Sequence, residues 1–103
     1  MKLMKKCIEK KFERFPIGSQ TGKGMDAEVV VKYFNPDGCG IWLITEGEEL
    51  WSGDWKLYGY CYTLKWSWRY VMLSELESFR ASSFGDIRRV RYIGKHSKIK
   101  DLI

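Results

Sequence analysis

The sequence predicts an α+β fold, a single domain with an antiparallel β-sheet of about five strands. Its 103 residues suffice for one core, and 45% of them are apolar while 30% are charged, which is typical of a folded globular chain. Helical patterns flank several runs in which apolar and polar residues alternate. The links between these runs are short and no alternation of strand and helix is visible, which favours antiparallel pairing.

Residues 2–15 predict an amphipathic helix at the start of the chain. Its apolar residues recur at steps of four, four and three, which places them on one helical face: Met4, Ile8, Phe12 and Phe15. Lysine and arginine crowd the opposite face. Pro16 ends the helix, and residues 16–26, with the glycine-rich stretch Gly18–Gly24, are expected to form a loop.

Residues 27–93 predict the sheet. Four runs with strand character follow one another, at 27–34, 41–46, 54–62 and 66–73. The first two are joined by the turn sequence Asn35-Pro36-Asp37-Gly38, so we expect them to form a hairpin. The tryptophans of these runs are assigned to the core or its rim: Trp42, Trp55, Trp66 and Trp68.

A short helix is expected before the last strand, near residues 74–80. Ser74 at the N-cap and Glu77 three residues later form a capping box, which is a start signal for a helix. Residues 87–93 then read as the last strand. The final segment, residues 94–103, predicts a loosely held basic tail, although its apolar residues could dock: Ile99, Leu102 and Ile103.

The net charge of +5 is divided unevenly along the chain. Residues 1–24 hold seven Lys and Arg against two acidic residues, residues 25–79 hold four against nine, and residues 80–103 hold seven against two. Two basic ends therefore surround an acidic middle. If the first helix packs beside the last strand, the two ends form one patch that attracts phosphate groups. Alternatively, the lysine-rich helix face is simply the solvated side.

Arginines of the last strand are the strongest candidates for binding. Arg88, Arg89 and Arg91 cluster on a short segment, and the planar guanidinium group suits phosphate, carboxylate or aromatic partners. Lysines of the two basic ends complete the predicted surface: Lys10, Lys11, Lys95, Lys98 and Lys100.

A row of tyrosines alternates along the third strand run: Tyr58, Tyr60 and Tyr62. Three rings on one strand face could stack on unpaired bases, so we include them in the candidate binding surface. The alternative is that the 16 aromatic residues of the chain mainly fill a small core.

Several classes of protein are disfavoured by composition. Three widely spaced cysteines without a CxxC motif and a single histidine argue against disulfides, a zinc site or another metal centre, and no cofactor-binding motif is present. No apolar run approaches the length of a membrane span. Lys2, Lys5 and Lys6 are not followed by the apolar region of an export signal. We therefore expect a cytoplasmic protein.

A nuclease motif is the main catalytic alternative. Pro36-Asp37 followed by Asp54-Trp55-Lys56 fits the pattern in which two carboxylates bind Mg²⁺ and a lysine steadies the attacking water. The predicted hairpin places Asp37 and Asp54 at opposite ends, roughly 15 to 20 Å apart, which is too far for one metal ion. The acidic residues of this region, Glu46, Glu48, Glu49 and Asp54, are expected in a solvated loop or a patch for a basic partner, and not in a metal site.

A resemblance to a known family rests on four segments: Val29–Asp37, Trp42–Glu46, Gly59–Cys61 and Tyr70–Glu77. With them, about residues 17–93 resemble Domain of Unknown Function 2958, and the last segment is the most specific. Members are small bacterial proteins of plasmids, phages and conjugative elements, with no established catalytic residues. Many members close with an acidic strand, whereas this chain has the arginine-rich Ile87–Tyr92 and a basic tail, which indicates a specialised partner.

The resemblance implies a role in mobile genetic elements, whose small proteins often counter host defence. Our leading hypothesis is a non-enzymatic, anti-CRISPR-like inhibitor that binds a host nucleic-acid-targeting nuclease, or its guide RNA complex, through a basic and aromatic surface. Neither a membrane nor a cofactor is expected, and the oligomeric state is not predicted. One alternative is the metal-dependent nuclease, and another is a nucleic-acid-binding accessory protein of plasmid or phage maintenance.

Overall fold

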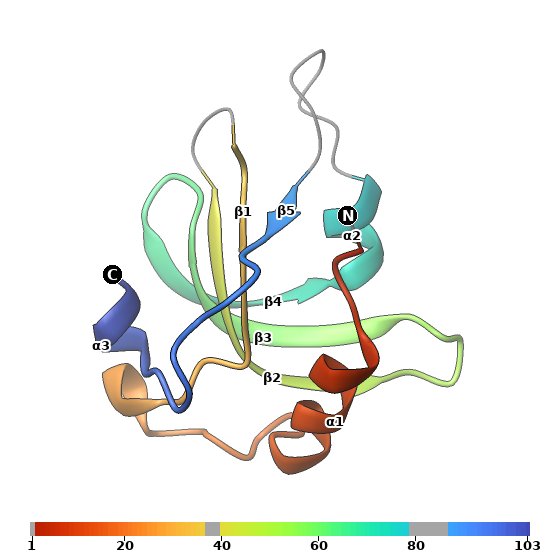
Figure 1. The fold of residues 1–103 in the computed structure, drawn as a ribbon, viewed down its shortest axis with the longest axis horizontal. Helices are drawn as coiled ribbons and strands as arrows, with labels where there is room; N and C mark the ends of the chain where they lie inside the picture. The colour runs from red at the N-terminus through yellow and green to blue at the C-terminus, as the bar shows by residue number, and fades with distance from the viewer. Residues whose placement is uncertain (1, 37–39, 79–86) are drawn as a thin grey trace.

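An antiparallel sheet organises the part of the chain that the computed structural model describes, residues 2–36, 40–78 and 87–103 (Figure 1). The strands lie in the order β4-β3-β2-β1-β5, and each neighbouring pair is antiparallel. Their bounds are β1 (Val31–Phe34), β2 (Ile41–Glu49), β3 (Trp55–Tyr62), β4 (Trp66–Met72) and β5 (Arg88–Arg89). The predicted α+β fold with an antiparallel sheet is therefore confirmed.

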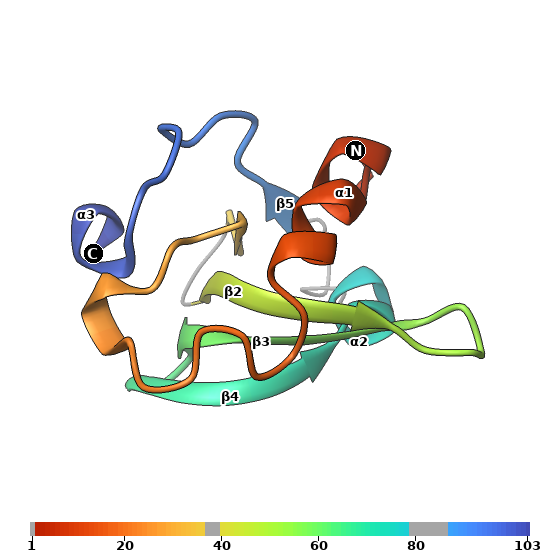
Figure 2. The same cartoon turned by 90° about the horizontal axis from the view of Figure 1, so that it is seen from below.

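Both faces of the sheet carry a hydrophobic core. The helices α1 (Lys6–Arg14) and α2 (Leu73–Ser78) contribute to the larger core. The 3₁₀ turn η1 (Gly24–Asp26) and helix α3 (Ile99–Leu102) contribute to the smaller one. Figures 1 and 2 show α1 and α3 well apart, with the chain that follows β5 running between them. None of the helices in the described ranges has the length and apolar character needed to cross a bilayer.

Helix α1 is held on the sheet by its apolar side. Phe12 is only 2% exposed, and its ring centroid lies 5.5 Å from that of Trp55. The helix can approach so closely because β2 has a glycine beneath this ring. A Cβ atom on Gly47 would lie 2.9 Å from the Phe12 ring, closer than real contacts allow. Gly47 therefore makes room for Phe12, and with it for the basic helix.

The first helix begins later than predicted, at Lys6 instead of residue 2. The residues before Lys6 pack against the sheet and do not form a helical turn. Leu3 is buried, and its carbonyl oxygen accepts a hydrogen bond of 2.6 Å from the Tyr33 hydroxyl. Burial raises the pKa of Tyr33, so the hydroxyl stays protonated and available as the donor.

The carboxyl-terminal segment, expected to be a loose basic tail, is packed against the molecule. The amide of Val29 donates to the Ser97 carbonyl at 2.8 Å, and the amide of Ile99 donates to the Ala27 carbonyl at 3.0 Å. Ile99 is fully buried in the smaller core. These contacts also explain why the run predicted as a strand from residue 27 enters the sheet only at Val31, where pairing with β2 is recorded.

The predicted last strand, residues 87–93, is also shorter in the structure. Arg88 and Arg89 pair with β1, opposite Phe34 and Tyr33, and the amide of Val90 donates to the Lys32 carbonyl at 2.9 Å. The chain beyond Val90 then leaves the sheet edge and runs toward α3 (Figure 1). The arginine-rich segment therefore starts as the edge strand of the sheet and continues, from Arg91, as an extended wall beside it.

Replacing Phe12 by alanine tests whether this ring holds α1 in place. We expect Phe12→Ala to lower the free energy of unfolding by about 3 to 5 kcal/mol, because a buried ring is lost and a cavity remains. Urea denaturation at neutral pH measures the change. The control is Trp51→Ala, which removes a fully exposed ring and should change stability by no more than about 0.5 kcal/mol. A loss below about 1 kcal/mol for Phe12→Ala would contradict this account.

Candidate functional site

A groove runs between α1 and the segment that follows β5. It consists of two adjoining hollows that share Lys11, Val30, Ile93 and Lys95 in their lining. Valines from the approach to β1 form the floor, α1 forms one wall, and the chain around residues 89–96 forms the other. The two basic ends of the sequence therefore face each other across one depression.

The lining of this groove is strongly cationic. Among the described residues, seven cations border it, and we call this feature the basic groove: Lys5, Lys11, Arg14, Lys32, Arg89, Arg91 and Lys95. The acidic residue in the lining is Glu28, whose carboxylate lies 2.6 Å from Nδ1 of His96. Within the described part of the chain, none of the seven cations forms an ion pair. Their charge is thus available to a ligand.

Arg89 is held in a defined orientation at one end of the basic groove. Its Nε–H donates to the carbonyl oxygen of Lys2 at 3.0 Å, and the side chain is half-buried. This hydrogen bond uses one of the five N–H donors of the guanidinium group and leaves the others for a ligand. A guanidinium fixed in this way loses less entropy on binding than a free side chain does.

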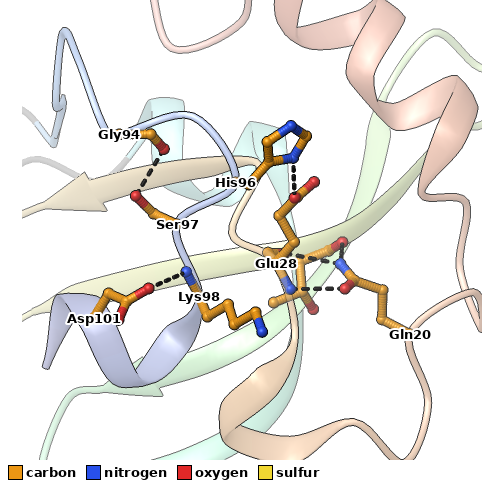
Figure 3. A network of polar contacts seen from close by, with 8 residues as sticks. Gln20, Glu28, Gly94, His96, Ser97, Lys98 and Asp101 are labelled. Atoms are coloured by element: carbon orange, nitrogen blue, oxygen red, sulfur yellow. Dashed lines mark hydrogen bonds and ion pairs between the residues drawn. The ribbon is translucent and has the colours of Figure 1, made fainter.

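The other end of the basic groove is supported by a polar network (Figure 3). Glu28 contacts His96 through its carboxylate and is held by Gln20 through its backbone. The side-chain Nε2 of Gln20 donates to the backbone carbonyl of Glu28 at 2.8 Å. Its Oε1 accepts from the backbone amide of Glu28 at 2.7 Å. His96 has a φ of 61°, a left-handed conformation within the turn that runs from Gly94 to Ser97. The network keeps the second wall of the groove close to the floor.

Glu46 anchors the loop that contributes Gln20 to this network. Its carboxylate accepts hydrogen bonds from the backbone amides of Gly18 at 2.6 Å and Gln20 at 3.0 Å. The side chain is 2% exposed, so the expectation that Glu46 belongs to a solvated acidic loop is wrong. A buried carboxylate with two backbone donors acts as a structural clamp, and the glycine-rich stretch is a fastened loop.

The structure divides the predicted binding cations into two groups. Lys11, Arg89, Arg91 and Lys95 line the basic groove. Lys10, Arg88 and Lys98 are exposed but lie outside its lining. Lys100 points to a different partner, the carboxylate of Asp26 at 2.8 Å.

The tyrosine row of β3 lies away from the basic groove and packs on β4. Tyr58 stacks on Trp68 with ring centroids 5.7 Å apart, and Tyr60 stacks on Trp66 at 5.0 Å. Tyr62 meets Trp66 at 5.4 Å. Tyr60 and both tryptophans also pack against the smaller core, on the sheet face opposite α1. These rings therefore cover a core, and their faces are largely taken by neighbours.

The candidate nuclease residues have other contacts. Asp37 lies outside the described residues. Asp54 accepts the Ser74 hydroxyl at 2.6 Å and the Ser74 amide at 3.1 Å, while Nζ of Lys56 lies 4.7 Å from the ring centroid of Tyr70. In the ranges that the structure describes, no three His, Cys, Asp or Glu residues are grouped as a metal site would require.

Asp54 caps α2, so the predicted capping box at Ser74 and Glu77 is wrong. The helix begins at Leu73, which places Ser74 inside the first turn. Asp54 accepts the Ser74 amide, and Glu75 accepts the Met72 amide at 3.0 Å. Both acceptors satisfy amides that have no partner within the helix.

Several groove residues were not singled out by sequence reasoning: Lys5, Arg14, Lys32 and Tyr92. Lys32 alternates with the buried Val31 and Tyr33, and this alternation was a usable signal for a partly exposed side chain. Cys7 is an exposed thiol in the lining. Cys61, in contrast, is buried in the larger core, and burial raises the pKa of its thiol to about 12, which makes it a poor nucleophile.

The Asp54 contact predicts a pH-dependent contribution to stability. The Ser74 hydroxyl lowers the pKa of the Asp54 carboxyl below its usual value. Ionised Asp54 therefore stabilises the fold above the ordinary pKa of an aspartate, and this contribution is lost as the pH falls through the folded-state pKa. We expect Asp54→Ala to cost about 1 kcal/mol at pH 7, and the difference from wild type to shrink in acid.

Urea denaturation over a series of pH values measures this difference, with the exposed Glu49 replaced by alanine as the control. A cost for Asp54→Ala that stays constant from neutral to acidic pH would contradict the capping role.

Comparison with known proteins identifies the family of the chain. No curated protein and no solved structure matches it. The model of one family, described as protein of unknown function DUF2958, matches residues 3–101. The match therefore extends well beyond the four segments that carry the resemblance, and it includes both walls of the basic groove. The chain belongs to the DUF2958 family.

Proposed function

We propose that this protein is a non-enzymatic binding protein whose basic groove takes the phosphate groups of nucleic acid. The observation that carries the proposal is the lining of the groove, where six cations from the two ends of the chain and Lys32 of β1 surround one depression. The acidic residue beside them, Glu28, is already engaged by His96. Nucleic acid is the polyanion that such a dense cationic lining suits best.

The energetics favour an extended anion over a single charged group. Each phosphate that a protein neutralises releases counterions, and this release supplies much of the affinity at moderate salt. Cations at both ends of the groove, from Arg89 to Arg14, can act on successive phosphates of one strand. Arginine contributes bidentate hydrogen bonds in addition to charge.

We further propose that the protein acts in the cytoplasm as an inhibitor of a host nucleic-acid-targeting nuclease. An inhibitor needs no active site, only a stable surface that competes for the ligand of the nuclease. By covering phosphates of the guide RNA or of the target strand, the groove would block assembly or substrate entry. The resemblance to a family whose members are expected to be small proteins of plasmids and phages supports this anti-CRISPR-like role.

A second candidate function follows from the same lining. A groove that binds bare nucleic acid also suits an accessory protein of plasmid or phage maintenance. The two roles differ in one outcome. An inhibitor lowers the rate of target cleavage by a guide-loaded nuclease at protein concentrations that saturate binding, whereas binding to the same oligonucleotides without any loss of cleavage would favour the accessory role.

Matched charge variants test the groove directly. We expect Lys11→Gln and Arg91→Gln each to weaken oligonucleotide binding about tenfold, because a charge-assisted contact to phosphate is lost. Each should also reduce the slope of log affinity against log salt by about 0.7. Lys10→Gln and Arg88→Gln remove the same charge from neighbouring residues outside the lining, and they serve as controls.

Fluorescence anisotropy of labelled oligonucleotides over a salt series measures both quantities. Equal losses in all four variants would show that net charge matters and the groove does not. Incubation of the oligonucleotides with Mg²⁺ tests the nuclease alternative, because cleavage that disappears in Asp54→Ala would overturn the non-enzymatic proposal.

A further inference from the structure

We infer that the ligand of the basic groove is a single strand, and that Tyr92 stacks on one of its bases. This inference rests on the proposed function and names the kind of nucleic acid. Three features carry it: the apolar floor of the groove, the exposed ring of Tyr92, and the confinement of the cations between two walls. None of these features is needed to bind phosphates alone.

The floor and lower walls of the groove are apolar. Val30 and Val31 form the floor beside Ile8 of α1, with only 4 to 6% of each residue exposed, and the half-buried Ile93 borders it from the other side. The cationic heads surround this apolar strip. A duplex presents mainly phosphates on its outside, so an apolar strip would gain little from it. An unpaired nucleotide can place its sugar or base against the exposed part of this strip, chiefly Ile93, while its phosphate meets the surrounding cations.

Tyr92 supplies an aromatic face at the groove. Its side chain is 80% exposed although it belongs to the groove lining. In the described part of the chain no aromatic ring stacks on it. Arg91 precedes it in the wall and Lys95 follows it. An unpaired ring between phosphate-binding cations is the arrangement that proteins use to bind unpaired bases.

The other exposed aromatic residues do not share this setting. Trp51 lies in the connection between β2 and β3, outside the groove lining. Tyr70 has Tyr58 at 4.6 Å between ring centroids and Lys56 over its face. The tyrosine row of β3 is stacked on β4, as described above. Tyr92 is therefore the ring best placed to meet a nucleotide whose phosphate lies in the groove.

The construction of the groove also favours a single strand. Its walls are one helix and one extended segment, and residues from both walls line the same hollow. Cations that converge on one hollow can surround the phosphates of one strand, whereas a duplex carries its phosphates on two strands.

The test uses four labelled probes of equal length: single-stranded RNA, single-stranded DNA, the matching duplex, and a DNA strand with abasic sites. We expect single strands to bind at least tenfold more tightly than the duplex. Tyr92→Ala should weaken single-strand binding about tenfold to 100-fold, as the loss of one stacked base does. It should leave the salt slope and the affinity for the abasic strand unchanged.

Two further variants make the test specific. Tyr92→Phe keeps the ring and should bind like wild type, and Trp51→Ala removes an exposed ring outside the groove and should have no effect. Duplex binding equal to that of single strands, or equal losses for Tyr92→Ala on normal and abasic strands, would overturn the inference while the groove charges still define a site. If no probe binds to the wild type, the proposed function fails and the inference fails with it.

The affinities for single-stranded RNA and single-stranded DNA identify which of the two the groove prefers. If either single strand binds more tightly than the duplex, the result supports the inference. Far-ultraviolet circular dichroism shows whether Tyr92→Ala is folded. Since Tyr92 is exposed, we expect its spectrum to match that of the wild type.

Discussion

The burial of the apolar side of α1 against the sheet is the interaction on which the rest of the structure depends. It holds one basic segment beside another, although their charges repel. Burying a side chain such as Ile8 or Phe12 contributes about 1.5 to 3 kcal/mol. Two exposed charges 4 Å apart repel by only about 1 kcal/mol in water, and salt screens them further. Hydrophobic burial therefore outweighs the repulsion, and the groove exists before any ligand arrives.

This balance explains why polar contacts gather around the groove. Arg89 donates a hydrogen bond to the carbonyl oxygen of Lys2. The side chain of Gln20 donates to the backbone carbonyl of Glu28 and accepts from its backbone amide. Glu46 in turn fastens the loop that carries Gln20. Each contact fixes a backbone segment that borders or supports the groove. A ligand would thus meet cations that are already in place, which lowers the entropy that binding costs.

Local patterns predicted much of this fold because they depend on neighbours in sequence. The amphipathic period from Met4 to Phe15 indicated α1, and alternation from Trp55 to Tyr62 indicated β3, since both periods follow from backbone geometry. The start of α1 was misplaced because a distant partner, Tyr33, binds the carbonyl of Leu3. The docking of Ile99 was left open for the same reason, since its burial depends on contacts with residues near Ala27.

The clustered cations of the candidate site can be predicted from the sequence, but the groove that they line cannot. The clustering of Arg89 and Arg91 is visible in sequence, but whether they face Lys11 depends on how α1 packs. The tyrosines of β3 looked like a stacking surface because alternation shows which residues share a face and not what covers it. Tyr92 was missed because a single ring in a basic segment has no period. Its significance comes from exposure and from its neighbours in space.

The central claim is that the two basic ends of the chain form one binding site. Nuclear magnetic resonance of the ¹⁵N-labelled protein, titrated with a short single-stranded oligonucleotide, tests it most directly. We predict that amide signals shift together on both walls, in residues 5–14 and 89–96, with one common dissociation constant, while those of Tyr58, Tyr60 and Tyr62 stay in place. Shifts confined to one wall, or centred on β3 and β4, would contradict the account.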